Sequence, residues 1–225
     1  MGRFPARHRV PEFSTFASLL RTATKYGFSD IREGLVEDLK EAYPTKWEDF
    51  ERAKVLGEDV FGPPRPHPNA VLNLLLEQRV KFALPFAAYR AAMGGFSSLI
   101  SSEPGAALPR LTLASTIYGM ERIRRVMFQL SHSIVYSGSI DACPQQECVL
   151  NIGMDSTEQG TEALKKIFDI MIEKSKGDLL SPFSLGDLVC VDCAKPLEDA
   201  HLHYREQFVW RALPSLLGAG GGSVM

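Results

Sequence analysis

Apolar residues in the first sixty positions recur every three or four residues, the spacing of one helix face. The first such series consists of Phe13, Phe16, Leu19, Leu20 and Ala23. It predicts a helix that ends at Gly27, because glycine is common just beyond the last helical residue. Ser29 is then expected to cap a second helix, which Pro44 ends. Thr45 and Glu48 match a capping box and predict a third helix.

A proline-rich segment at residues 62–68 interrupts this helical pattern. Proline fits neither a helix interior nor an inner strand, so we expect an extended joint here and the main internal boundary of the chain. Beyond it, Asn69 is expected to cap a helix that carries the apolar stretch from Val71 to Val80. A further helix follows Pro85, and residues 101–110 are small, polar and proline-bearing, which predicts a loop.

The longest helical pattern runs from Leu111 to about Val135. Its inward face is predicted to consist of Leu113, Ile117, Met120, Ile123, Met127, Leu130 and Ile134. A helix opened by Ser156 or Thr157 follows, and Pro196 is expected in the first turn of a final helix. The residues expected to face inward on that last helix are Leu202, Phe208, Val209 and Leu213. Because no alternating strand of useful length is present, the predicted class is all-α, an irregular bundle of about seven to nine helices.

Composition places the chain among ordinary globular proteins, with 45% hydrophobic and 23% charged residues. The net charge of -2 supplies no general attraction to nucleic acid or to an anionic membrane. Residues 1–11 are basic and lack the apolar core of a secretory signal, and no apolar run is long enough to span a bilayer. We therefore expect a protein of the cytoplasm or nucleus that binds neither nucleic acid nor membrane.

The four cysteines form two close pairs, Cys143 with Cys148 and Cys190 with Cys193. Two such pairs separated by a helix-length spacer are typical of a tetrahedral zinc site. Four thiolates would fill the coordination sphere, so the zinc would be structural and would staple the C-terminal part of the fold. Two other interpretations stay open: four thiols without a ligand, and a disulfide or redox-active pair.

Other candidate chemistry is weaker. His201 and His203 could each replace a cysteine as a zinc ligand, but ordinary histidines on a helix surface are the favoured interpretation. The cluster Arg122, Arg124 and Arg125 is interpreted as surface residues. The chain has no nucleophile elbow, no P-loop and no dinucleotide fingerprint, so no catalytic residue is predicted and the protein is not expected to be an enzyme.

Several segments resemble the C-terminal portion of fungal BTB/POZ domain-containing proteins. The resemblance covers roughly residues 12–217. Its segments are residues 16–32 (FASLLRTATKYGFSDIR), residues 39–48 (LKEAYPTKWE), Leu111-Thr-Leu, the first cysteine pair, residues 190–195 (CVDCAK) and residues 203–214 (HYREQFVWRALP). In that family the first of these segments close the BTB fold, and a helical extension called BACK follows.

The resemblance implies a five-part chain. Its parts are a disordered basic N-terminus at 1–11, helices resembling the end of a BTB fold at 12–61, the joint at 62–68, a BACK-like region with the cysteine pairs at 69–217, and a flexible tail at 218–225. The BTB core that carries dimerisation is expected to be missing, so a BTB-type homodimer and recruitment of cullin-type ligases are not expected. Without that core, Phe16, Leu20 and Leu35 are expected to be exposed.

The function predicted on these grounds is that of a non-enzymatic interaction or adaptor protein whose protein partners are unknown. Two alternatives stay open, namely a small cysteine-based metal or redox enzyme and an inactive gene fragment.

Overall fold

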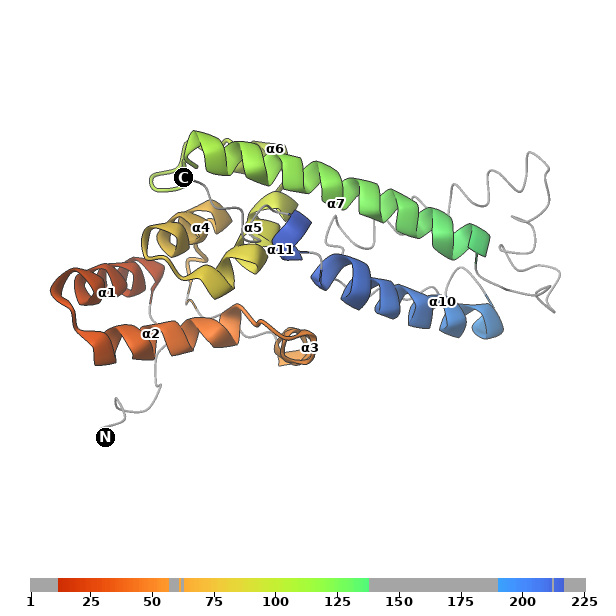
Figure 1. Ribbon diagram of the computed structural model, residues 1–225, viewed down its shortest axis with the longest axis horizontal. Helices are drawn as coiled ribbons and strands as arrows, with labels where there is room; N and C mark the ends of the chain where they lie inside the picture. Colours follow the sequence, from red (N-terminus) through yellow and green to blue (C-terminus); the bar gives the residue numbers. More distant parts are fainter. Residues whose placement is uncertain (1–11, 57–60, 62, 138–189, 212, 217–225) are drawn as a thin grey trace. The chain divides into compact units, whose positions relative to one another are not determined.

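The computed structural model describes residues 12–56, 61, 63–137, 190–211 and 213–216 of the chain (Figure 1). These residues form α-helices, one short 3-10 segment and one π-helical segment, and no strand occurs among them. The all-α class is therefore confirmed. The chain divides into two compact units, with the division between Met120 and Glu121. The proline-rich joint lies inside the first unit, and its role as a boundary between family regions stays a prediction.

Helices α1 (Phe13–Tyr26) and α2 (Ser29–Ala42) begin the first unit. Gly27 ends α1 as predicted, in the left-handed conformation with φ of 70°, which glycine adopts without a Cβ penalty. The carbonyl of Ala23 accepts the backbone N–H of Gly27 and also that of Phe28, the latter at 2.9 Å, which closes the end of the helix. This short reversal lets α2 follow after two residues.

The inner face of α1 is fully buried. Phe16, Ala17, Leu20 and Ala23 are all covered, and the ring of Phe61 makes edge-on contacts with Phe13 and Phe16 at 5.2 and 5.3 Å between centroids. The expectation that Phe16 and Leu20 are exposed is therefore wrong, and Leu35 is half-buried. The physical reason is that α1 packs on its own neighbours α2 and Phe61, so its apolar face needs no separate BTB core.

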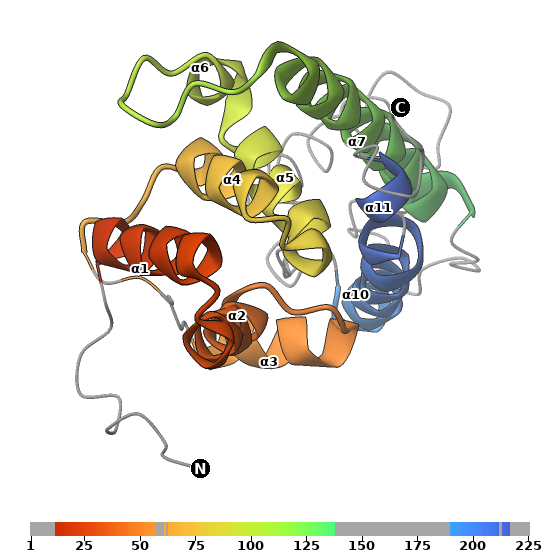
Figure 2. The ribbon, with the colours of Figure 1, turned by 60° about the vertical axis from the view of Figure 1, so that its left-hand side comes forward.

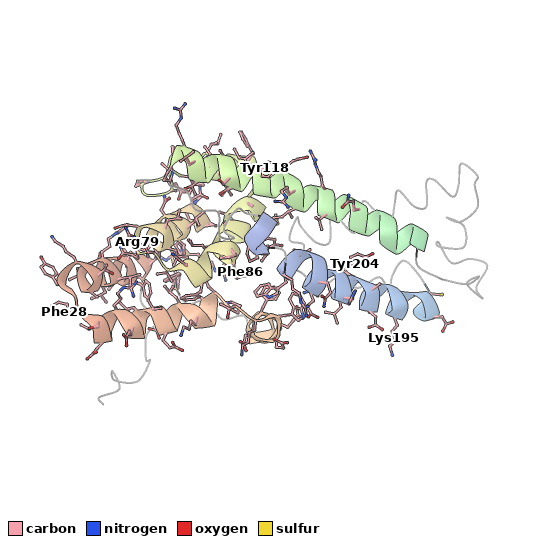
Figure 3. The ribbon with its side chains drawn as sticks, viewed as in Figure 1. Phe28, Arg79, Phe86, Tyr118, Lys195 and Tyr204 are labelled. Atoms are coloured by element: carbon pink, nitrogen blue, oxygen red, sulfur yellow. The ribbon has the colours of Figure 1, made fainter. Side chains whose placement is uncertain are left out.

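An aromatic cluster joins α2 to α3 (Trp47–Leu56) and to α5 (Leu84–Met93). The ring of Phe86 in α5 contacts Tyr43 at 6.0 Å, Phe50 at 5.5 Å and Tyr89 at 6.1 Å, and Phe50 contacts Trp47 at 5.3 Å. Phe86 is labelled in Figure 3. Such offset and edge-on pairs add to the apolar burial of each ring and fix the orientation of α3.

The start of α3 differs slightly from the predicted capping box. The first backbone bond of this helix runs from the N–H of Phe50 to the carbonyl of Lys46, 3.1 Å away. Lys46 is thus the residue at the cap position, and Thr45 lies one residue outside it. A Thr-x-x-Glu pattern alone does not decide between neighbouring cap positions.

Helix α4 (Pro68–Glu77) lies between α1 and α5 (Figure 2). It buries Val71, Leu72, Leu74 and Leu75, and a 3-10 turn, η1 (Lys81–Ala83), connects it to α5. The chain reverses at Arg79, which has a φ of 54°. Helix α6 (Gly95–Leu99) and helix α7 (Arg110–Ser137) follow, and the predicted loop separates them.

The N-terminus of α4 is capped differently from the prediction. His67, not Asn69, is the N-cap residue, and its Nδ1 accepts a hydrogen bond of 3.2 Å from the backbone N–H of Asn69. Pro68 occupies the first helical position, where a missing N–H costs nothing and a fixed φ favours the helix. Because proline takes that position, the cap moves to the residue before it, and the Asn69 side chain is released for another role.

A two-point ion pair ties α1 to the end of α4. Arg21 Nε lies 3.0 Å from both Glu77 carboxylate oxygens, and Arg21 Nη2 lies 2.8 Å from Oε2. Both side chains are about half exposed, with relative accessibilities of 50% and 48%. The hydrogen bonds from Arg21 hold the pKa of Glu77 below its ordinary value, and those to Glu77 hold the pKa of Arg21 above its own.

The second unit contains α10 (Val191–Tyr204), the π-helical segment η2 (Arg205–Trp210) and α11 (Leu213–Leu216). The helix predicted to have Pro196 in its first turn is α10, and it begins five residues earlier, at Val191. Leu202 is 44% exposed, which corrects its predicted inward orientation, whereas Val209 and Leu213 are buried as predicted. The side chain of Phe208 lies outside the described residues.

The π-helical segment explains why the buried face differs from the predicted one. The N–H of Arg211 donates to the carbonyl of Glu206, five residues back, at 3.1 Å. This wider turn keeps residues four apart nearly in line, and the buried series is His201, Arg205, Val209 and Leu213. His201 is buried and His203 exposed, so the expectation of two surface histidines holds only for His203.

Leu20→Ala and Leu19→Ala test the burial of α1 in one matched pair. Leu20 has no exposed surface and Leu19 is 47% exposed, although the two residues are adjacent. We expect Leu20→Ala to lower the free energy of unfolding by about 2–5 kcal/mol, because it leaves a cavity. Leu19→Ala should change it by less than about 1 kcal/mol. Urea denaturation measures both, and equal effects would contradict the described packing of α1.

The Arg21–Glu77 pair should stabilise the protein only where Glu77 is ionised. Because the pKa of Glu77 is lowered in the folded state, this contribution is present above the unfolded carboxyl pKa and is lost as pH falls through the lowered pKa. A double-mutant cycle with Arg21→Gln and Glu77→Gln should give a coupling energy of about 0.2–1 kcal/mol at neutral pH and none in acid. The Lys40–Glu37 pair within α2, at 2.7 Å, is the matched control, because it joins no two helices.

Candidate interaction surface

The predicted zinc ligands are only partly within the described residues. Cys190 is half-buried and precedes the first residue of α10, and Cys193 lies on α10, although its side chain is not described. Cys143 and Cys148 fall in 138–189, outside the described ranges. Among the side chains that are described, no group of three or more His, Cys, Asp or Glu could hold a metal ion. The four-cysteine site stays a prediction.

His67 and Ser98 contact each other at 3.3 Å between Nε2 and Oγ. Such a pair invites comparison with a nucleophile and its general base. A base would need a free lone pair on Nε2. Here Nδ1 already accepts the N–H of Asn69, so the proton of a neutral ring lies on Nε2, which then donates to Ser98. The pair therefore joins α4 to α6 and is not arranged to activate the serine.

The side-chain amide of Asn69 holds the end of α6 and the following loop. Asn69 is fully buried, and its Nδ2 lies 2.9 Å from the carbonyl oxygen of Ser98, 3.3 Å from that of Leu99 and 3.1 Å from that of Ala106. The Ser98 carbonyl also accepts the backbone N–H of Ser101 at 3.2 Å, so there Asn69 adds a second donor. A buried carbonyl left without any donor would cost about 1–3 kcal/mol. Asn69 therefore ties the end of α6 and the following loop to α4.

Asn73 repeats this contact one turn further along α4. Its Nδ2 donates to the carbonyls of Gly105 and Ala107, each at 2.9 Å. The loop reaches this position through a turn at Glu103-Pro104-Gly105-Ala106, in which the N–H of Ala106 donates to the carbonyl of Glu103 at 3.0 Å. Gly105 has a φ of 79°, as a type II turn with proline before it requires. Loop residues 105–107 thus lie along α4 with successive carbonyls bound by two asparagines.

The outward side of α7 carries an apolar surface. Leu111 is 78% exposed and Tyr118 is 65% exposed, seven residues and two turns later. Exposed Ala114 lies between them on the same side, because residues three and four apart share a helix face. Figure 3 shows Tyr118 on the outer edge of α7. We call Leu111, Ala114 and Tyr118 the α7 surface.

The opposite side of α7 agrees with the predicted inward face. Met120 and Ile123 are buried and Leu113 and Ile117 half-buried, whereas the side chains of Met127, Leu130 and Ile134 are not described. The apolar series predicts only the covered face of α7 and does not indicate the α7 surface. The available signal was the pair Leu111 and Tyr118, which are apolar at positions off that series.

Two other apolar groups are exposed in the first unit. Phe96 and Ile100, four residues apart at α6, are each more than half exposed. Tyr26 and Phe28 at the turn between α1 and α2 are exposed as well, but their rings lie 6.2 Å apart and Lys25 Nζ lies 5.3 Å from the Tyr26 ring centroid. The exposed fractions of Leu111 and Tyr118, 78% and 65%, exceed those of the residues in both other groups.

The arginine cluster on α7 behaves as predicted where it is described. Arg125 is exposed and its Nε lies 3.4 Å from Oε1 of Glu121, one turn earlier. Arg122 is half-buried, and the side chain of Arg124 is not described. An exposed i, i+4 pair of this kind stabilises a helix by only a few tenths of a kcal/mol, about 0.3–0.5.

Comparisons with known proteins give no relative. No protein-family model matches the chain, and neither a curated protein nor a solved structure matches it significantly. The resemblance to BTB/POZ proteins receives no support from them and stays a prediction. In the part of the chain that the structure describes, no helix is both long and apolar enough to cross a bilayer.

Replacement of Cys190 tests the predicted zinc site. If Cys143, Cys148, Cys190 and Cys193 bind one zinc, the purified chain should contain about one zinc ion, and Cys190→Ser should lose it. Structural zinc contributes roughly 10–16 kcal/mol of apparent binding in peptides, so a chelator should lower the melting temperature of the natural chain markedly. His203→Ala is the matched control and should keep the metal. Elemental analysis with well under one zinc per natural chain would contradict the site.

Proposed function

We propose that this protein is a non-enzymatic interaction protein that binds a protein partner through the α7 surface. The observation that carries the proposal is the exposure of Leu111 and Tyr118 on one side of one helix. Single exposed apolar residues are ordinary, but a row on one face of a helix is typical of interaction sites. Tyrosine is also among the residues that most often dominate binding energy at interfaces.

The surroundings of the α7 surface support this proposal. Arg110 and Ser115, both exposed, border the apolar row and supply polar groups at its edge. An apolar centre with a polar rim is the usual anatomy of a protein interface. A standard interface buries about 800 Å² on each partner, so the row would be the centre of a larger contact area.

The polar groups of the first unit support a non-enzymatic role. The Nε2 of His67 is committed as a donor to Ser98, and the Asn69 and Asn73 amides are committed to backbone carbonyls. Each of these groups holds one segment of the fold against another. The proposal also includes the expected zinc site in the C-terminal part, a location in cytoplasm or nucleus, and a relationship to BTB-type chains.

Substitution of the α7 surface tests the proposal. We expect Leu111→Ser with Tyr118→Ser to weaken partner binding at least about tenfold, because apolar contact at the interface centre is lost. Both residues are exposed, so the free energy of unfolding should change by less than about 0.5 kcal/mol for each. The measurement is affinity capture from the native cell with the natural and the doubly substituted chain, followed by binding assays with each protein retained.

Leu202→Ser is the matched control, because Leu202 is an exposed leucine on α10 rather than α7. Partners that use the α7 surface should be retained by this control and lost by the double variant. If both variants retain the same proteins with the same affinity as the natural chain, the α7 surface is not the binding site.

A further inference from the structure

We propose that Asn69 and Asn73 form a latch that holds the loop before α7 and sets the position of the α7 surface. The inference deepens the proposed function and rests on it for its role in partner binding. The latch consists of two side-chain amides on one face of α4, one turn apart. Together they donate to five backbone carbonyl oxygens, those of Ser98, Leu99, Gly105, Ala106 and Ala107.

Apart from the latch, the described loop has local hydrogen bonds and the half-buried side chains of Ser101 and Leu108. Ala106 is fully buried, but Ser102, Glu103, Pro104, Gly105 and Ala107 are all exposed. A segment with few buried apolar contacts opens at a lower free energy than the core around it. Because apolar burial contributes so little here, the hydrogen bonds from Asn69 and Asn73 determine whether the loop stays on α4.

The latch has fewer donor hydrogens than carbonyl acceptors. Two side-chain amides supply four hydrogens for the five carbonyls, so at least two acceptors share one hydrogen. The Oδ1 atoms of Asn69 and Asn73 are buried, and no group in the described chain donates to them. A buried polar network that is only partly satisfied is less stable than a complete one. We infer that the latch opens more readily than a fully paired network would.

Opening of the latch would reach the α7 surface directly. The loop ends at Pro109, whose carbonyl accepts the N–H of Leu113 at 2.8 Å and so starts the hydrogen bonding of α7. Leu111 lies between these two residues. Release of residues 100–109 frees the first turn of α7, and Leu111 then loses its fixed position relative to Tyr118. A closed latch keeps the two apolar side chains in one row.

Asparagine-to-aspartate substitutions test the latch on the full-length chain. Asn69→Asp and Asn73→Asp keep the side-chain shape but remove the donors and place a carboxylate against the carbonyls. Hydrogen exchange of the backbone amides should show about tenfold or faster exchange at Ala106 and Leu113. The amide of Leu20 in α1 should exchange at its original rate. Ser102→Asp adds the same charge to the exposed loop and should leave all three rates unchanged.

If Asn69→Asp fails to fold, Asn73→Asp alone tests the latch, because Asn73 is less buried and has two carbonyl partners. Unchanged exchange rates at Ala106 and Leu113 would overturn the latch. An equal increase in the exchange rate at Leu20 would overturn it as well, because it indicates global destabilisation. Exchange is measured without a partner. The two proposals can therefore fail separately. If the asparagine variants speed exchange locally but Leu111→Ser with Tyr118→Ser binds its partners normally, the proposed function is refuted and the latch proposal stands.

Discussion

Burial of α4 on several sides is the constraint on which the first unit depends. Its apolar positions pack beneath the surrounding helices, and even its second residue, Asn69, is fully covered. A buried amide must find partners, because an unpaired polar group in the interior is costly. The partners are main-chain carbonyls at the end of α6 and in the loop that follows it. The same helix therefore contributes apolar burial and supplies the hydrogen bonds that close an irregular loop.

The sequence predicts the helices well where burial follows the helical period. The end of α1 at Gly27, the loop before α7 and the inward residues Met120 and Ile123 are all predicted. The predicted role of a residue is wrong where a polar side chain occupies a buried position. Nothing in the pattern distinguishes Asn69 as a buried donor from Asn69 as a helix cap, and only the carbonyls brought near it by folding decide between the two roles.

The candidate sites also differ in whether they depend on local sequence or on contacts distant in sequence. The cysteine spacing is a local feature and yields a zinc prediction from the sequence alone, but three of the four thiols lie beyond the described side chains. The α7 surface requires knowledge of which helix faces are covered, which depends on contacts distant in sequence. The π-helical turn after Tyr204 is similar, since it rotates Leu202 outward and places His201 inward without any apolar signature.

The aromatic cluster around Phe86 has a practical consequence for spectroscopy. The chain has two tryptophans, and Trp47 lies in this cluster in the first unit, whereas Trp210 lies in the second. Each compact unit thus carries its own fluorescent reporter at the end or start of a helical segment. Replacement of either indole by phenylalanine leaves a single emitter. The melting of one unit can then be followed separately, and cooperativity between the two becomes an observable quantity.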